Sequence, residues 1–107
     1  MIQITVFRDS SKNYKGYEVS GHAGYAEAGE DIICASVSVL TQNTANSIEK
    51  FTSDWIEGEM ADGYLKVMFP QGTGKESKLL LDSMVSGLED IVENYGKRYV
   101  KIRFKEV

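Results

Sequence analysis

Cys34 and His22 are the residues whose side chains could perform covalent chemistry together, and each is the only residue of its type in the chain. A thiolate is a good nucleophile, and an imidazole can deliver a proton to a leaving group near neutral pH. His22 precedes Cys34 by twelve positions, and a loop of that length can fold back on itself. A contact between the two side chains is therefore geometrically easy, and acyl transfer is the chemistry it would support.

Cys34 is expected near the start of a helix, where a thiolate would be favoured. Helical periodicity begins at about Ile32, so Asp31 is the natural N-cap and Cys34 the third helical residue. Unpaired backbone N–H groups and the positive end of the helix dipole lower the pKa of a thiol in this setting. The same N–H groups could hold an oxyanion. Ser38 follows one turn later, close enough for its hydroxyl to reach the thiol region.

The segment between His22 and this helix is expected to be a mobile loop. It contains Gly24 and Gly29, follows Gly21, and shows neither helical nor strand-like periodicity. We therefore expect residues 21–30 to form a flexible loop beside the thiol.

The rest of the chain predicts the elements that must position the loop and the thiol. Five segments have strand patterns, at residues 2–7, 17–20, 55–60, 64–69 and 99–104, and two have helical patterns, at residues 32–51 and 75–95. The order ββαββαβ predicts a single α+β domain over residues 1–107, with a mixed or antiparallel sheet and two helices packed on one face. The residues expected to face the core include Ile33, Val37, Leu40, Thr44, Ile48, Phe51, Leu81, Met84, Leu88, Ile91, Tyr95, Val100, Ile102 and Phe104.

Charge and cysteine content exclude several classes of function. The 107 residues include 12 basic and 16 acidic side chains, a net charge of −4. This balance argues against nucleic acid as a direct partner and favours a basic one. A single cysteine excludes an internal disulfide and a cysteine-rich zinc site. The chain start lacks the features of a signal peptide, and polar residues interrupt the longest uncharged run, so we expect a cytoplasmic protein without membrane contact.

Three other interpretations of Cys34 stay open on these residues alone. The thiol could be a small buried filler in a non-catalytic module that binds a basic protein or peptide. It could be a redox sensor, although the chain has no resolving cysteine. A metal site of His22, Asp31 and Cys34 would have too few ligands.

The residues around the thiol resemble the signature of the ribosomal-processing cysteine protease Prp family. The signature is carried by Gly21-His22-Ala23 and by Gly29-Glu30-Asp31-Ile32-Ile33-Cys34-Ala35-Ser36-Val37-Ser38. Chain length and element order agree with the family over nearly the whole sequence. Ile33 stands where valine is usual in the family, and Ser36 where alanine or glycine is usual.

The resemblance implies a bacterial endopeptidase that removes the N-terminal extension of a large-subunit ribosomal protein during ribosome assembly. Cys34 would be the nucleophile and His22 its general acid–base partner, with Asp31 and Ser38 supporting the site. The loop with the three glycines would close over the peptide. The family further implies a homodimer that needs no metal or organic cofactor.

Overall fold

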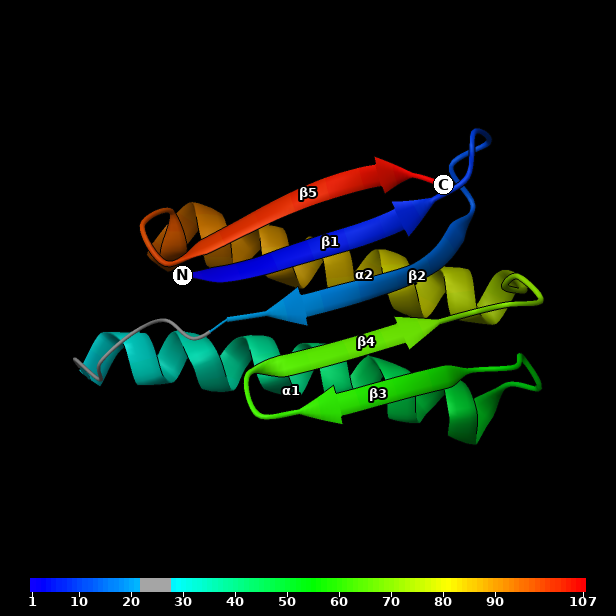
Figure 1. Ribbon diagram of the computed structural model, residues 1–107, viewed down its shortest axis with the longest axis horizontal. Coiled ribbons are helices and arrows are strands. Elements are labelled where there is room, and N and C mark those ends of the chain that lie inside the picture. Colours follow the sequence, from blue (N-terminus) through cyan, green and yellow to red (C-terminus); the bar gives the residue numbers. More distant parts are fainter. Residues whose placement is uncertain (22–27) are drawn as a thin grey trace.

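The computed structural model describes residues 1–21 and 28–107, without the side chains of residues 28–31 and 96. Its element order confirms the predicted ββαββαβ arrangement, with a short π-helical segment added after the second helix (Figure 1). In chain order the elements are β1 (Ile2–Arg8), β2 (Tyr14–Ser20), α1 (Ala28–Phe51), β3 (Glu57–Ala61), β4 (Tyr64–Met68), α2 (Lys75–Ile91), η1 (Val92–Gly96) and β5 (Val100–Glu106).

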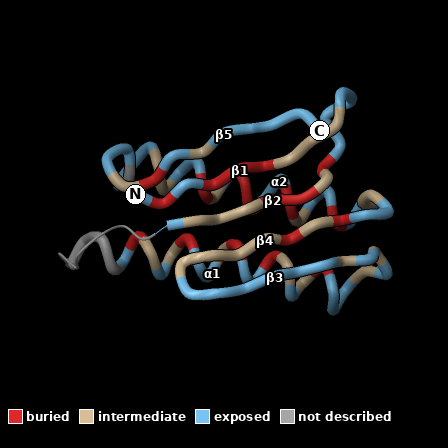
Figure 2. Tube along the Cα trace, viewed as in Figure 1, coloured by how far each residue is buried: buried red, intermediate tan, exposed pale blue. Residues whose placement is uncertain are grey.

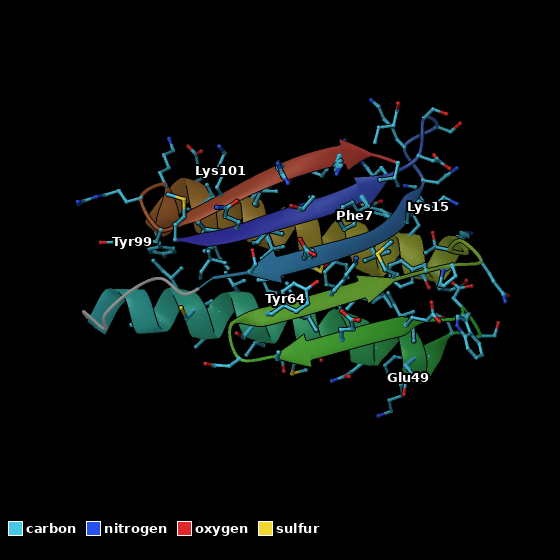
Figure 3. All side chains as sticks on the ribbon, viewed as in Figure 1. Phe7, Lys15, Glu49, Tyr64, Tyr99 and Lys101 are labelled. Atoms are coloured by element: carbon cyan, nitrogen blue, oxygen red, sulfur yellow. The ribbon has the colours of Figure 1, made fainter. Side chains whose placement is uncertain are left out.

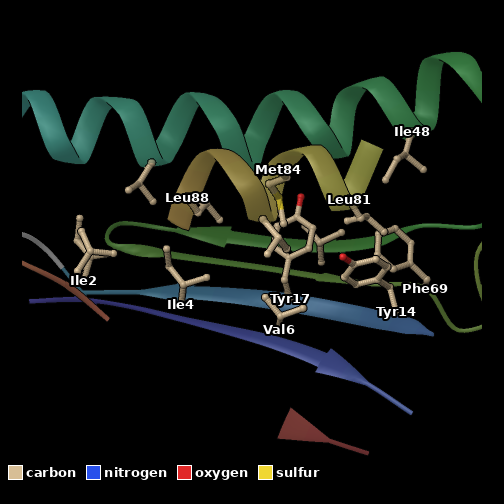
Figure 4. Packing of buried hydrophobic residues seen from close by; sticks show 14 of the residues in the cluster. Ile2, Ile4, Val6, Tyr14, Tyr17, Ile48, Phe69, Leu81, Met84 and Leu88 are labelled. Atoms are coloured by element: carbon tan, nitrogen blue, oxygen red, sulfur yellow. The ribbon is translucent and has the colours of Figure 1, made fainter. Parts of the chain in front are cut away.

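The strands form one mixed sheet in the order β3-β4-β2-β1-β5. The pair β1 and β5 is parallel, and the other three pairs are antiparallel. Both helices cover the same face of this sheet, as predicted (Figure 1). The alternation of β1 explains this arrangement, because Ile2, Ile4 and Val6 are buried under the helices. Figure 4 shows Ile4, Val6 and Tyr17 of the sheet facing Leu81 and Met84 of α2.

The segment Ala61-Asp62-Gly63 predicts a hairpin turn. In the structure the connection between β3 and β4 is the two residues Asp62 and Gly63. Ala61 pairs with Tyr64 across it, and Gly63 has a φ of +68°, a conformation that glycine adopts without steric cost. The carbonyl of Gly63 also accepts a hydrogen bond from the N–H of Gly21 at 2.9 Å. The hairpin is thereby tied to the end of β2, next to the segment that leads into α1.

Three aromatic residues expected in the core are exposed in the structure. The prediction was wrong because a periodic pattern indicates which residues share a face but not how far the facing surface extends. Phe51 is 69% exposed at the last residue of α1, and Tyr95 is 75% exposed in η1, where the change from α-helical to π-helical geometry alters the side-chain register. Phe104 is 41% exposed, and the guanidinium of Arg8 lies 4.1 Å from its ring centroid.

Leu81 offers a direct test of this core, because Leu79 on the same helix is a matched control. Leu81 is 0% exposed and Leu79 is 70% exposed. Figure 2 shows that α2 has both buried and exposed residues along its length. Leu81→Ala is expected to lower the free energy of unfolding by about 2–5 kcal/mol through lost burial and a cavity. Leu79→Ala should change it by less than about 0.5 kcal/mol. Urea denaturation measures both, and equal losses would contradict this placement of the core.

Asp54, in the connection between α1 and β3, forms hydrogen bonds with the start of α2. Its carboxylate accepts hydrogen bonds from the hydroxyl of Ser77 at 2.5 Å and from the N–H of Gly74 at 2.9 Å. Ser77 is completely buried. These bonds favour the charged carboxylate and lower the pKa of Asp54 below its ordinary value of 3.8, with the Ser77 hydroxyl as the largest cause.

The stability that Asp54 provides is expected to depend on pH. Because folding lowers its pKa, the contribution is present above the ordinary value of 3.8 and is lost as pH falls through the lower folded value. Asp54→Asn should therefore be less stable than the parent at pH 7, and the gap should narrow below about pH 4. Urea denaturation at pH 7 and pH 3 tests this, with Asp90→Asn, an exposed acid on α2, as the control. A gap that is constant with pH would mean that the charge of Asp54 has no role.

Candidate active site

The helix that carries Cys34 begins earlier than its sequence pattern predicts. α1 starts at Ala28, four residues before Ile32, so Asp31 lies inside the first turn and is not the N-cap. Gly29, expected in the loop, also belongs to the helix. The sequence pattern did not predict this boundary because residues 28–31 have no apolar periodicity. A helix is nevertheless favoured there, since alanine and glutamate are good helix formers.

This earlier start changes the electrostatic argument for Cys34. The cysteine is the seventh residue of α1, whereas the dipole effect falls off within the first turn. The N–H groups that have no partner within a helix are the first four, here those of residues 28–31. Any oxyanion binding by the helix would therefore come from the turn before Cys34.

Cys34 nevertheless lies where a peptide could reach it. It is half-buried, packs against the edge of the hydrophobic core, and lines a surface pocket of about 240 Å³. A thiol enclosed by the core would have excluded proteolysis. The pocket walls come from α1, the start of β1, the end of β2 and the β3–β4 hairpin. They comprise Ile2, Val19, Gly21, Cys34, Val37, Ser38, Thr41, Gln42, Met60, Ala61, Asp62, Gly63, Tyr64 and Leu65.

Two of the residues predicted to surround the thiol line this same pocket. Ser38 follows Cys34 by one turn of α1 and is exposed, as the helical spacing predicts. Gly21 has a φ of +92°, and a side chain there would collide with the carbonyl of Met1. The backbone geometry therefore requires a glycine at this position of the pocket wall. His22 and Gly24 lie outside the described residues.

The β3–β4 hairpin is the part of the pocket that the sequence did not reveal. Asp62 and Gly63 are recognisable as a turn, but nothing local says that this turn lies opposite Cys34. Tyr64 follows the turn and donates a hydrogen bond to the carboxylate of Glu18 at 2.8 Å (Figure 3 labels Tyr64). This bond raises the pKa of Tyr64 above its ordinary value.

The described part of the chain shows neither a cluster of metal-ligating side chains nor a membrane-spanning helix. Over residues 1–21 and 28–107, the side chains that are described form no group of three or more His, Cys, Asp or Glu that could hold a metal ion. Neither helix of this part combines the length and hydrophobicity needed to cross a bilayer.

Comparison with known proteins identifies the family. A family model described as cysteine protease Prp matches residues 1–101. The chain belongs to the cysteine protease Prp family. This membership confirms the family that the signature around Cys34 indicated, and with it the prediction of a cysteine-type protease.

Individual Prp relatives agree over almost the full length. A Bacillus subtilis protein named ribosomal processing cysteine protease Prp is 30% identical over 101 residues, covering 89% of this chain and 90% of the relative. The crystal structure of an essential ribosomal processing protease Prp from S. aureus, in complex with a covalently linked product peptide, superimposes with a TM-score of 0.88 at 25% identity. The match covers 98% of this chain and 100% of that one.

A second similar structure is that of a Streptococcus mutans protein. It has a TM-score of 0.88 and 30% sequence identity, and the match covers 100% of this chain and 96% of that one. The fold predicted from the sequence is thus the fold found among the solved structures of Prp proteins.

Proposed function

We propose that this chain is an endopeptidase that removes the N-terminal extension of a large-subunit ribosomal protein during ribosome assembly. The observation that carries the proposal is that Cys34, the one cysteine of a chain in the Prp family, lines a surface pocket. The B. subtilis relative is named for ribosomal processing, and the S. aureus relative holds a covalently linked product peptide. The net charge of −4 suits a basic ribosomal protein.

Cys34 is the proposed nucleophile and His22 its general acid–base partner. The thiolate attacks the carbonyl carbon of the scissile bond, forming a thioester as the C–N bond breaks, and His22 gives its proton to the departing amine. A water molecule then attacks the thioester, His22 takes one of its protons, and the carboxylic acid product leaves with the thiolate restored. Gly21, which precedes His22 in the sequence, lines the same pocket as Cys34, and this supports the pairing.

Asp31 and Ser38 are proposed to support this pair. Ser38 lines the pocket one turn after Cys34, which supports a role for its hydroxyl in binding the peptide or the developing oxyanion. Asp31 lies in the first turn of α1, where a carboxylate interacts favourably with the helix dipole. Gly21, Gly24 and Gly29 flank or lie within the segment that we expect to order itself over the bound peptide.

The remaining features of the proposal follow from the family resemblance. We expect residues 1–107 to act as one Prp domain, as a homodimer in the bacterial cytoplasm, without a metal or an organic cofactor. We expect no direct binding to nucleic acid, in keeping with the excess of acidic over basic residues.

The decisive experiment is incubation of the purified protein with the full-length ribosomal protein from the same cell. Mass spectrometry should show loss of a short N-terminal segment from the ribosomal protein and no other cleavage. Binding without any trimming would contradict the proposal and favour a non-catalytic binding module. Trimming that is unaffected by alkylation of Cys34 would assign the activity to another group or to a contaminant.

A further inference from the structure

We propose that β3 binds the substrate as an added sixth strand and selects a segment in which basic and apolar residues alternate. The inference rests on the proposed protease function and deepens it, because it names the surface that holds the substrate and the chemistry it recognises. Three independent features of β3 support it, namely its position in the sheet, the hollow beside it and the charges on it.

The first feature is that β3 is an edge strand. It pairs with β4 and ends the sheet on that side, and all five of its residues are exposed (Figure 2). The outer edge of such a strand presents backbone N–H and C=O groups that can pair with another extended chain. An extended peptide that adds to a sheet edge obtains affinity from these bonds and specificity from alternate side chains.

The second feature is a pair of adjoining hollows between this strand and Cys34. The pocket that contains Cys34 is also lined by Met60 and Leu65. A second hollow of about 260 Å³ shares these two residues and continues along α1 to Glu49 (Figure 3 labels Glu49). At about 1.5 Å per helical residue, the distance from Cys34 to Glu49 is about 22 Å, which is the length of about seven extended residues.

The third feature is that the two faces of β3 differ in chemistry. Met60 pairs with Leu65, and these two residues form the apolar part of the hollow on the helix side together with Val67 and Ile56. Glu59 reaches the rim of this hollow from the strand edge. The intervening residues Glu57 and Glu59 have the opposite orientation in the strand.

The negative charges of Glu57 and Glu59 could interact with a positively charged partner. The two glutamates line a hollow of the sheet edge with Lys66 and Met68, and Glu59 also lines the hollow on the helix side. Among the residues that the structure describes, neither Glu57 nor Glu59 takes part in an ion pair within 4.0 Å.

These features define the sequence pattern that fits the edge. Side chains of an added strand alternate between the two faces of the sheet. One set would contact Met60 and the apolar wall of the hollow, and the other would lie beside Glu57 and Glu59. An alternation of apolar and basic residues satisfies both faces, and an acidic residue at the second set would be repelled.

The proposal is tested by measuring peptide binding to a protein that lacks the Cys34 thiol, so that the result does not depend on cleavage. The parent is Cys34→Ala, the charge-reversed protein adds Glu57→Lys and Glu59→Lys, and the control adds Glu89→Lys and Asp90→Lys on the exposed side of α2. The probes are two fluorescent ten-residue peptides, one alternating lysine with valine and one alternating glutamate with valine. Fluorescence anisotropy at low salt measures their dissociation constants.

The parent and the α2 control should prefer the lysine peptide by about tenfold or more, because each exposed charge pair contributes up to about a factor of five. The β3 variant should lose or reverse this preference. Hydrogen–deuterium exchange should show slower exchange of β3 amides when the lysine peptide is bound. Equal preferences in all three proteins, or protection elsewhere only, would overturn the inference. Such a result could coexist with trimming of the ribosomal protein by the wild type, so the two proposals fail separately.

Discussion

Cys34→Ala is expected to abolish trimming of the ribosomal protein, with a fall in kcat/KM of about 10³-fold or more. Alanine has no group that can form the thioester, while the pocket and its walls stay in place. Because the side chain is half-buried and alanine fits its space, the free energy of unfolding should change by no more than about 1 kcal/mol. Mass spectrometry of the ribosomal protein measures the turnover, and urea denaturation measures the stability.

Two further variants separate loss of the nucleophile from damage to the pocket. Cys34→Ser preserves the size of the side chain but should lose nearly as much turnover, since a serine hydroxyl is a far weaker nucleophile without further activation. Ser38→Ala changes the same pocket one helical turn away and should keep measurable turnover. Full activity in Cys34→Ala would remove this residue from the mechanism.

His22→Ala is expected to lower kcat by about 10²- to 10⁴-fold, the usual contribution of a positioned general acid–base group. The departing amine would otherwise leave without a proton, which is the slow step of amide cleavage that the imidazole relieves. The dependence of kcat on pH is the more specific measurement. The wild type should show a pH dependence of kcat that the variant lacks.

Added imidazole provides a control for this variant. Partial recovery of turnover by free imidazole would show that the missing proton-transfer group caused the loss. Alkylation of Cys34 by iodoacetamide should still proceed in His22→Ala, which shows that the thiol is still accessible. A His22→Ala protein with unchanged kcat and an unchanged pH profile would assign proton transfer to another group.

The sequence alone determined the chemistry and the local structure of this protein, because both depend on residues that lie close together in the chain. The spacing of Gly21, His22 and Cys34 indicated the Prp family, which the family match over residues 1–101 confirmed. Alternation in β1 and helical periodicity in α1 and α2 predicted the element order and the helix-covered face, both confirmed. Ala61-Asp62-Gly63 predicted the β3–β4 turn, since the geometry of a tight turn depends on its own few residues.

Only the tertiary structure decided where these elements meet. Whether the sheet is mixed depends on β5 pairing with β1, two strands almost a hundred residues apart. The start of α1 at Ala28 and the exposure of Phe51, Tyr95 and Phe104 depend on how far neighbouring surfaces extend, which no local pattern records. For the same reason the sequence did not show that the β3–β4 hairpin forms a wall of the Cys34 pocket. That contact joins segments whose residues have no local reason to be together, and only the packing of α1 under the sheet edge brings them side by side.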